Sequence, residues 1–281
     1  MIYFSTGGYK NKTFFEAIED LKDSNIANFE LSGGKYIPNV EDKLLELSKH
    51  YNFSIHNYFP PSKMPFVFNL ASLNKDILNK SVAHVHDSIH LSSIVGAKFY
   101  SFHAGYLIDP QVDELGNKIK KRYLNDRQVA LKSFINKVNE LSEYAEKLGI
   151  KLLIENNVLS KRNYENFGEN PLLMVDFEET QKIMKETNEN VGLLIDVGHL
   201  KVSSKTLKYS VDNFFSGLDN YIDGYHLSDN DGFEDSNDKI SKNSWFWQYI
   251  DKNADYFSLE IYNIDPLTAQ KQFEITCEQL L

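Results

Sequence analysis

The sequence predicts an α/β protein of the (β/α)8 TIM barrel class, built as a single domain over residues 1–281. Eight short apolar segments alternate with longer amphipathic ones, which is typical of parallel strands joined by crossover helices. The length suits this fold, since such barrels commonly take about 250 residues. No G-x-G-x-x-G turn follows the first strand, and this favours a closed barrel over an open nucleotide-binding sheet.

The eight predicted strands are short, apolar and bounded by polar residues or glycine, as buried strands are. In chain order they are IYFST (2–6), IANFELS (26–32), FSIHNYF (53–59), KFYSFHA (98–104), KLLIEN (151–156), VGLLIDV (191–197), IDGYHLS (222–228) and YFSLEIY (256–262).

Helical patterns fill much of the chain between these strands. They cover residues 13–22, 40–51, 78–95, 127–148, 177–187 and 269–281. Gly149 comes directly after the fourth of these, where a glycine is expected to end a helix.

Three connections are long: 59–76, 104–126 and 157–175. Each follows a strand, so each is expected at the C-terminal face of the barrel, where barrel enzymes build their sites. Loops of this length in a compact domain are often lids or substrate contacts. We therefore expect them to contribute to a binding site.

The composition excludes several classes of protein. The net charge of −10 argues against nucleic-acid partners, because such proteins neutralise phosphates with basic residues. No signal peptide and no apolar run of membrane-spanning length is seen, so no membrane association and a cytoplasmic location are expected. The single cysteine, Cys277, forms no intramolecular disulfide and no cysteine zinc cage. The 16 Tyr and 19 Phe hint at a subunit contact in a homo-oligomer.

Residues that bind divalent metals stand at the ends of six successive predicted strands. They are His56, His103, Glu155, Asp196 with His199 three residues later, His226 with Asp229 and Asp231 just beyond, and Glu260. The C-terminal ends of barrel strands meet at one rim, so these side chains are expected to converge there.

Three carboxylates in this set lie inside apolar runs: Glu155 in LLIEN, Asp196 in LLIDV and Glu260 in FSLEI. Burying an unpaired carboxylate costs several kcal/mol, and three at one rim repel one another. A divalent cation removes this repulsion. The pattern therefore predicts a metal site. Carboxylates favour Mn²⁺ or Mg²⁺, and added histidines move the preference toward Zn²⁺ or Co²⁺.

Seven short motifs carry a resemblance that covers nearly the whole chain. They are FELSGG (29–34), IHNY (55–58), SFHAG (101–105), IENN (154–157), LIDVGHL (194–200), YHLSDNDG (225–232) and LEIY (259–262). Through them the chain resembles the xylose-isomerase-like superfamily of sugar isomerases, epimerases and apurinic endonucleases. LIDVGHL followed by HLSDNDG is the most specific part.

The resemblance to the epimerase branch implies one divalent metal held by Glu155, Asp196, His226 and Glu260. It also implies that Glu155 and Glu260 are the catalytic acid–base pair. The endonuclease branch implies further zinc ligands at His56, His103 and His199 and a D-x-H element after the seventh strand.

Here the chain departs from the endonuclease pattern. The expected D-x-H falls on Asp235-Ser236-Asn237, with asparagine in place of histidine. Asparagine is a poor zinc ligand, which puts a third zinc and phosphodiester cleavage in doubt.

The resemblance and the strand-end residues together lead us to expect a metal-dependent isomerase or epimerase that moves a proton on a small-molecule carbohydrate. His56, His103, His199, Asp229 and Asp231 are expected to bind substrate or a second metal. Three alternatives stay open: a zinc-dependent hydrolase of the endonuclease branch, a non-catalytic sugar-binding barrel, and a dehydratase of a related small acid.

Overall fold

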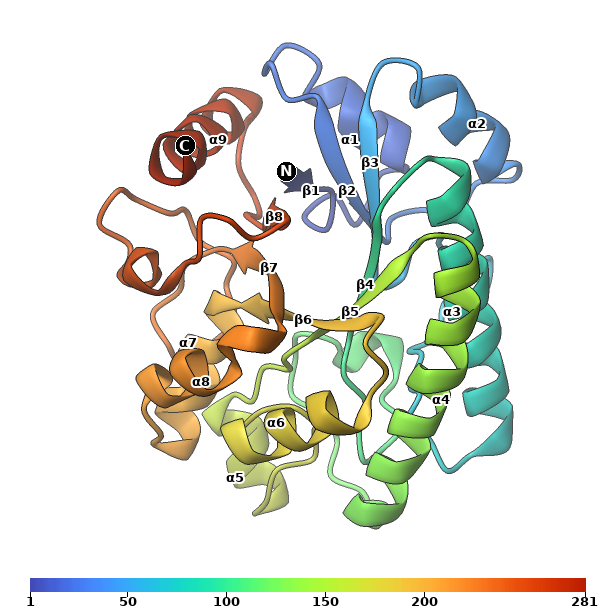
Figure 1. The fold of residues 1–281 in the computed structure, drawn as a ribbon, viewed down its shortest axis with the longest axis vertical. Helices are drawn as coiled ribbons and strands as arrows, with labels where there is room; N and C mark the ends of the chain where they lie inside the picture. Colours follow the sequence, from blue (N-terminus) through green and yellow to red (C-terminus); the bar gives the residue numbers. More distant parts are fainter.

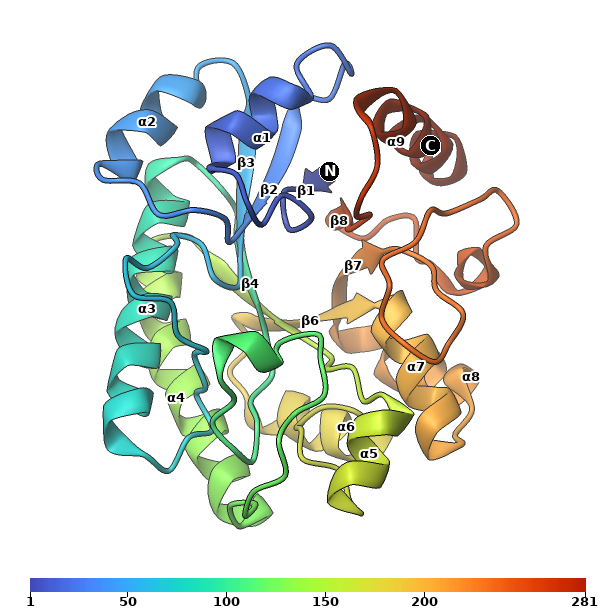
Figure 2. The same ribbon diagram turned by 180° about the vertical axis from the view of Figure 1, so that it is seen from behind.

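The computed structural model describes residues 1–281 and confirms the predicted fold: eight parallel strands close into a barrel in chain order. Figures 1 and 2 show the strands at the centre with helices around them. The strands are β1 (Ile2–Ser5), β2 (Asn28–Ser32), β3 (Asn52–His56), β4 (Phe99–His103), β5 (Lys151–Glu155), β6 (Val191–Asp196), β7 (Ile222–Leu227) and β8 (Tyr256–Leu259). The eighth strand ends before Glu260, which lies directly after it.

Nine α-helices cover the barrel. They are α1 (Phe14–Asp20), α2 (Val40–Leu47), α3 (Lys75–Ile94), α4 (Arg127–Lys147), α5 (Lys161–Phe167), α6 (Phe177–Glu186), α7 (Val197–Leu207), α8 (Val211–Leu218) and α9 (Pro266–Leu280). No helix combines the length and the apolar character that crossing a membrane requires.

The helical patterns predicted from the sequence are all found, with shifted ends. Thr13 lies just before α1 and caps it, because its hydroxyl accepts from the amide of Glu16 while the Glu16 side chain bonds back to Thr13. After β7 the structure differs from a regular strand–helix unit, since only a short 3₁₀ helix, η3 (Trp245–Tyr249), precedes β8. The connection is rich in Asp, Asn and Ser, which favour turns over helix.

The strand register brings the candidate site residues to one rim. His103 pairs with Glu155 across β4 and β5, and Asp196 pairs with His226 across β6 and β7. Because strand side chains alternate between the two faces of the sheet, these four residues share the inward-facing rows. They therefore form the last inward layer at the C-terminal end of the barrel.

The core has two parts. The main cluster of 53 buried residues fills the space between the strands and the helices. Inside the barrel a smaller cluster of aromatic and leucine side chains forms a layer below the candidate site: Tyr3, Phe99, Leu153, Leu194 and Tyr256. This layer packs the barrel interior on the side of the candidate site away from the C-terminal face.

The three long loops pack on one another through their own apolar cluster. Its members are Val67, Tyr106, Ile108, Ile119, Leu159, Phe167, Leu172 and Val175. The Asn69 side chain ties two of these loops together, because its amide nitrogen donates to the carbonyls of Tyr106 and Ile108. The three loops therefore pack together as one unit and are not separate surface loops.

Candidate functional site

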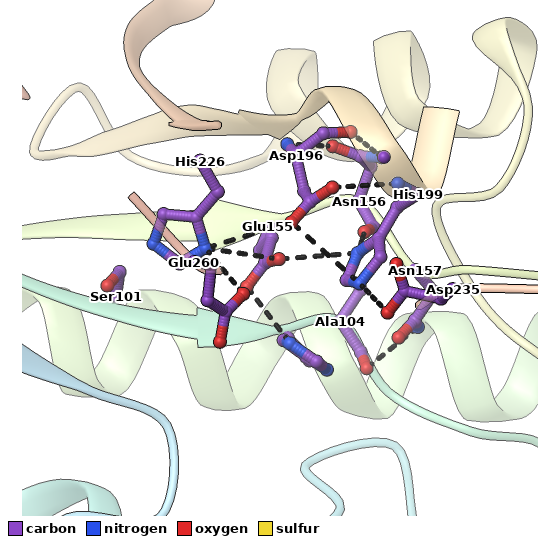
Figure 3. A network of polar contacts seen from close by, with 12 residues as sticks. Ser101, Ala104, Glu155, Asn156, Asn157, Asp196, His199, His226, Asp235 and Glu260 are labelled. Carbon is purple, nitrogen blue, oxygen red and sulfur yellow. Dashed lines mark hydrogen bonds and ion pairs between the residues drawn. The ribbon is translucent and has the colours of Figure 1, made fainter. Parts of the chain in front are cut away.

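Four side chains predicted to form a metal site converge at the C-terminal end of the barrel. Glu155, Asp196, His226 and Glu260 each offer one ligand atom, and these atoms lie within 4.8 Å of one another. The His226 Nδ1 atom lies 3.4 Å from Glu155 Oε1, 3.4 Å from Glu260 Oε2 and 4.0 Å from Asp196 Oδ2. Figure 3 shows the four side chains pointing toward one another.

Local backbone contacts fix Asp196. Its Oδ1 atom accepts from the amide of His199 at 2.7 Å and so caps α7. Its own amide donates to Asn156 Oδ1, and Asn156 Nδ2 donates to the Asp196 carbonyl. One carboxylate oxygen is therefore used for the helix cap, and Oδ2 faces the other three side chains.

Several atoms at the centre of this group are buried and have no hydrogen-bond partner. They are both carboxylate oxygens of Glu155, Oδ2 of Asp196 and Nδ1 of His226. Buried polar atoms are rarely left unpaired, because each costs about 1–3 kcal/mol. Three carboxylates and one imidazole, with free lone pairs aimed at one another, fit a divalent cation.

The charges in this group influence one another strongly. Burial raises the pKa of Glu155, but His103 and His226 outweigh this effect and hold the pKa well below its usual range. Burial lowers the pKa of His226, yet the Glu30 and Glu155 carboxylates raise it well above the ordinary value. Glu155 is therefore ionised at neutral pH and available as a ligand or a base.

The pKa of Asp196 is shifted in the opposite direction from that of Glu155. Burial is the largest influence on its pKa and raises it, His199 opposes this, and the negative charges of Glu155, Asp235 and Glu260 add to it, giving a value of about 7. The neighbouring carboxylates thus disfavour a further negative charge on Asp196 when no cation is present. A bound divalent cation would offset this repulsion.

A second group of potential ligands shares Glu155. The Nε2 atoms of His103 and His56 lie 3.0 Å and 3.4 Å from Glu155 Oε2, and one potential ligand atom of each of the three residues lies within 4.8 Å of the others. His103 is the most open of them, with 24% of its side chain exposed, whereas His56 is buried. Glu155 therefore stands between two clusters, each able to hold a cation.

His199 is buried beside Asp235, whose side chain is 21% exposed. Its Nδ1 atom donates to the carbonyl of Asn156 at 2.8 Å, so Nε2 is the nitrogen that faces Asp235 Oδ2, 3.3 Å away. Asn237, at the position of the expected histidine, is buried, and its backbone carbonyl accepts from the amide of Tyr262. His199 and Asp235 thus form a pair without a third imidazole.

Asp229 and Asp231 lie outside these clusters. Asp229 Oδ1 pairs with Lys201 Nζ at 2.6 Å, and its Oδ2 accepts from Ser244. Asp231 is exposed, and its Oδ1 accepts from the amide of Phe233 in a local turn. The structure therefore places both residues in the architecture of the loop after β7.

Two residues near these four side chains were not among the predicted site residues. Glu30 in β2 is buried and accepts a hydrogen bond from His226 Nε2 at 2.7 Å. The Tyr262 hydroxyl donates to Glu260 Oε1 at 2.7 Å. Glu30 stands in an apolar strand between Phe29 and Leu31, which is the signal that singled out Glu155, but it precedes the strand end by two residues.

Gly7 and Gly8 make room for this part of the site. A Cβ atom on Gly7 would lie 2.8 Å from the Tyr262 hydroxyl and 2.9 Å from Glu260 Oε1. The pair of glycines therefore allows the turn after β1 to pass close to Glu260, in addition to forming the turn itself.

Comparison with known proteins identifies the family. A family model described as xylose isomerase-like TIM barrel matches residues 13–268. The chain is 25% identical over 232 residues to an uncharacterized protein, MJ1614, of Methanocaldococcus jannaschii, covering 83% of this chain and 78% of that protein.

Two further matches represent the two branches of this fold. A probable endonuclease 4 of Thermoplasma acidophilum is 23% identical over 214 residues, which cover 74% of this chain and 59% of that protein. The crystal structure of a D-tagatose 3-epimerase-like protein superposes with a TM-score of 0.73 at 21% identity, covering 99% of this chain and 96% of the other. From the family match and these similarities, the chain belongs to the xylose isomerase-like TIM barrel family.

Proposed function

We propose that this protein is a divalent-metal-dependent isomerase or epimerase that transfers a proton on a small carbohydrate or carbohydrate derivative. The observation that carries the proposal is the buried group of Glu155, Asp196, His226 and Glu260, whose ligand atoms lie within 4.8 Å of one another. The overall similarity to a D-tagatose 3-epimerase-like protein supports the choice of reaction class.

These four residues would hold the cation, with Mn²⁺, Mg²⁺, Zn²⁺ and Co²⁺ as candidates. When bound, such an ion supplies Lewis-acid stabilisation of negative charge that develops on substrate oxygens.

Glu155 and Glu260 would move the proton. Glu155 Oε1 and Glu260 Oε2 each lie 3.4 Å from His226 Nδ1, so the two carboxylates approach the centre of the site from different strands. A substrate carbon held between two such groups can lose a proton to one and regain it from the other. His226 and Asp196 would hold the centre in place.

The substrate would enter from the side where the cluster meets solvent. His103 and Asp235 have 24% and 21% of their side chains exposed, and His199 Nε2 lies 3.3 Å from Asp235 Oδ2. Imidazole and carboxylate groups are suited to hydrogen bonds with sugar hydroxyls. We therefore assign His103, His199 and Asp235 to orienting substrate oxygens.

The test measures proton exchange with solvent. The metal-loaded protein is incubated with a panel of ketoses and aldoses in D₂O, and deuterium incorporation is followed by NMR. We expect exchange at a carbon next to the carbonyl, and we expect Glu155→Gln and Glu260→Gln each to slow it by at least about 100-fold. Glu114→Gln is the matched control, because Glu114 is another buried carboxylate but pairs with Arg122 outside the cluster.

If wild-type protein exchanges no substrate proton across the panel, the proposed reaction class is wrong. If exchange occurs and one of the two glutamine variants keeps the wild-type rate, that glutamate is not the base.

A zinc-dependent hydrolase is the second candidate, and one observation favours it. His56, His103 and Glu155 form a further group able to hold a metal next to the first one. Two metals with a bridging carboxylate suit the activation of water for phosphodiester hydrolysis. Asn237 in place of a third histidine speaks against this alternative, as does the net charge of −10.

Metal counting and a cleavage assay separate the two candidates. Elemental analysis of zinc-loaded protein gives the number of ions per chain, and an abasic DNA duplex reports nicking. Nicking that is lost in His103→Ala would support the hydrolase and overturn the isomerase proposal. Absence of nicking together with sugar proton exchange would exclude the hydrolase.

A further inference from the structure

A buried contact across the barrel links β2 to β7. Glu30 and His226 have no exposed surface, and Glu30 Oε2 lies 2.7 Å from His226 Nε2. In the closed barrel, two strands, β8 and β1, lie between β7 and β2, so this contact crosses the interior and does not join neighbouring strands. A carboxylate buried at this depth is costly, so its presence requires a specific role.

The contact decides which nitrogen of His226 faces the candidate metal ligands. A carboxylate only accepts hydrogen bonds when ionised, so Nε2 carries the hydrogen that Glu30 receives. The other nitrogen, Nδ1, has no hydrogen-bond partner and faces Glu155 and Glu260.

Glu30 is itself held from below. The hydroxyl of Tyr256 donates to the same oxygen, Oε2, and the Tyr256 ring belongs to the inner apolar layer with Tyr3, 5.2 Å away between ring centroids. Two hydrogen bonds, from Tyr256 to Glu30 and from His226 to Glu30, therefore connect the inner apolar layer of the barrel to the His226 ring that carries Nδ1. Such a carboxylate–histidine arrangement fixes the tautomer and the ring orientation of a metal-binding histidine and raises its basicity.

We propose that Glu30 is a positioning residue of the metal centre, which acts through His226 by presenting the Nδ1 lone pair to the cation. The inference rests on the proposed function, because it requires that Glu155, Asp196, His226 and Glu260 bind a metal. It adds a residue that does not touch the ion and that sets the strength of binding.

The test compares metal affinity in matched variants. Each protein is stripped with a chelator and titrated with Mn²⁺ by calorimetry, while Co²⁺ absorption reports the coordination. Glu30→Gln keeps the size of the side chain and removes its charge, and Glu30→Asp withdraws the carboxylate from His226. We expect each to weaken Mn²⁺ binding by about 10- to 100-fold and to alter the Co²⁺ spectrum.

Asp223→Asn is the control on the same strand. Asp223 lies three residues before His226 in β7 and pairs with Lys151 at 2.7 Å, so this variant loses an ion pair of β7 without touching the ligands. It is expected to lower thermal stability while leaving Mn²⁺ affinity at the wild-type value. Circular dichroism identifies the variants that fold, and either Glu30 variant suffices for the comparison.

The outcomes separate the inference from the proposed function. If wild-type protein binds no divalent metal, both are overturned. If it binds Mn²⁺ and a folded Glu30 variant binds within about twofold of wild type, Glu30 has only a structural role and the inference alone is wrong. If Glu30→Gln lowers the number of ions bound per chain, Glu30 is itself a ligand, and the positioning role is again overturned.

Discussion

Buried carboxylates in this chain are stabilised in two different ways. The carboxylates at the barrel rim face histidines and one another. Glu114, in the loop after β4, is surrounded only by hydrogen-bond donors. Its two oxygens accept from Arg122, from the amide of Gln111 and from the amide of Lys120. Burial raises the pKa of Glu114, but these donors outweigh it and lower the pKa from 4.5 to about 2. Glu114 therefore stabilises the fold and keeps no unpaired oxygen for a ligand.

This difference predicts how stability responds to acid. Because the pKa of Glu114 is lower in the folded chain than in the unfolded one, its contribution is complete above about pH 5 and falls as the pH drops toward 2. We expect urea unfolding to show a large loss of stability for Glu114→Gln at pH 7 and a much smaller loss at pH 3. An equal loss at both values would contradict the role of the ionised carboxylate.

Among the elements, β6 and β7 meet closely at the end of the barrel opposite the site. A Cβ atom on Gly192 of β6 would lie 1.7 Å from Asp223 Oδ2 of β7, and Asp223 pairs with Lys151 of β5. Glycine at this position leaves room for an ion pair that joins three neighbouring strands. The same strand pair carries Asp196 and His226 at its other end, beyond a register shift between Leu193 and Leu194.

We expect Gly192→Ala to destabilise the protein by about 1–3 kcal/mol, because the added methyl group displaces Asp223 and overpacks the barrel. Thermal or urea unfolding measures the loss. Removing the obstructing side chain is the control: in an Asp223→Ala background, Gly192→Ala should cost much less, since the two residues are in contact. If the two substitutions change the free energy of unfolding additively, the protein avoids the clash by moving residues other than Asp223.

The short helix α5 was not predicted from the hydrophobic pattern along the chain. Residues 157–175 were expected to be a loop, and they contain α5 (Lys161–Phe167). Its signals are present: the Ser160 hydroxyl accepts from the amide of Asn163, and Gly168 ends the helix in a left-handed conformation. With only seven residues, however, α5 spans about two helical turns, which is too short for a helical repeat of apolar residues to be recognised. Packing of Phe167 in the loop cluster stabilises this helix.

For the whole molecule, the proposed metal site would link folding to metal binding, because buried carboxylates at the rim lie close together without a cation. An ion that binds only the folded chain stabilises it by about 2.7 kcal/mol when present at 100 times its dissociation constant. For a chain of this size, that corresponds to a rise in melting temperature of about 5–10 °C. We expect Mn²⁺ or Co²⁺ to produce this rise and a chelator to reverse it.

The matched variant for this measurement is Glu155→Gln, which removes the carboxylate shared by both ligand groups. Its melting temperature should respond little to either ion. A wild-type protein whose melting temperature does not change with any of the four candidate metals would contradict the metal centre.

The barrel and the convergence of four candidate metal ligands could both be predicted from patterns along the chain. Apolar segments of strand length, repeated eight times, require parallel pairing, and carboxylates inside apolar strands require a compensating charge. Glu155, Asp196, His226 and Glu260 could be predicted because each stands at or next to a strand end, and all strand ends meet at one rim.

The contacts that other residues make with these four depend on how distant segments pack together, and patterns along the chain do not predict them. Glu30 reaches His226 across the interior, and Asp229 turns to Lys201, because both contacts depend on how distant strands and loops pack in three dimensions. Spacing along the chain indicates the face on which a side chain lies, but it does not indicate the partner on the opposite wall of a closed barrel, since that partner is set by barrel closure and side-chain packing.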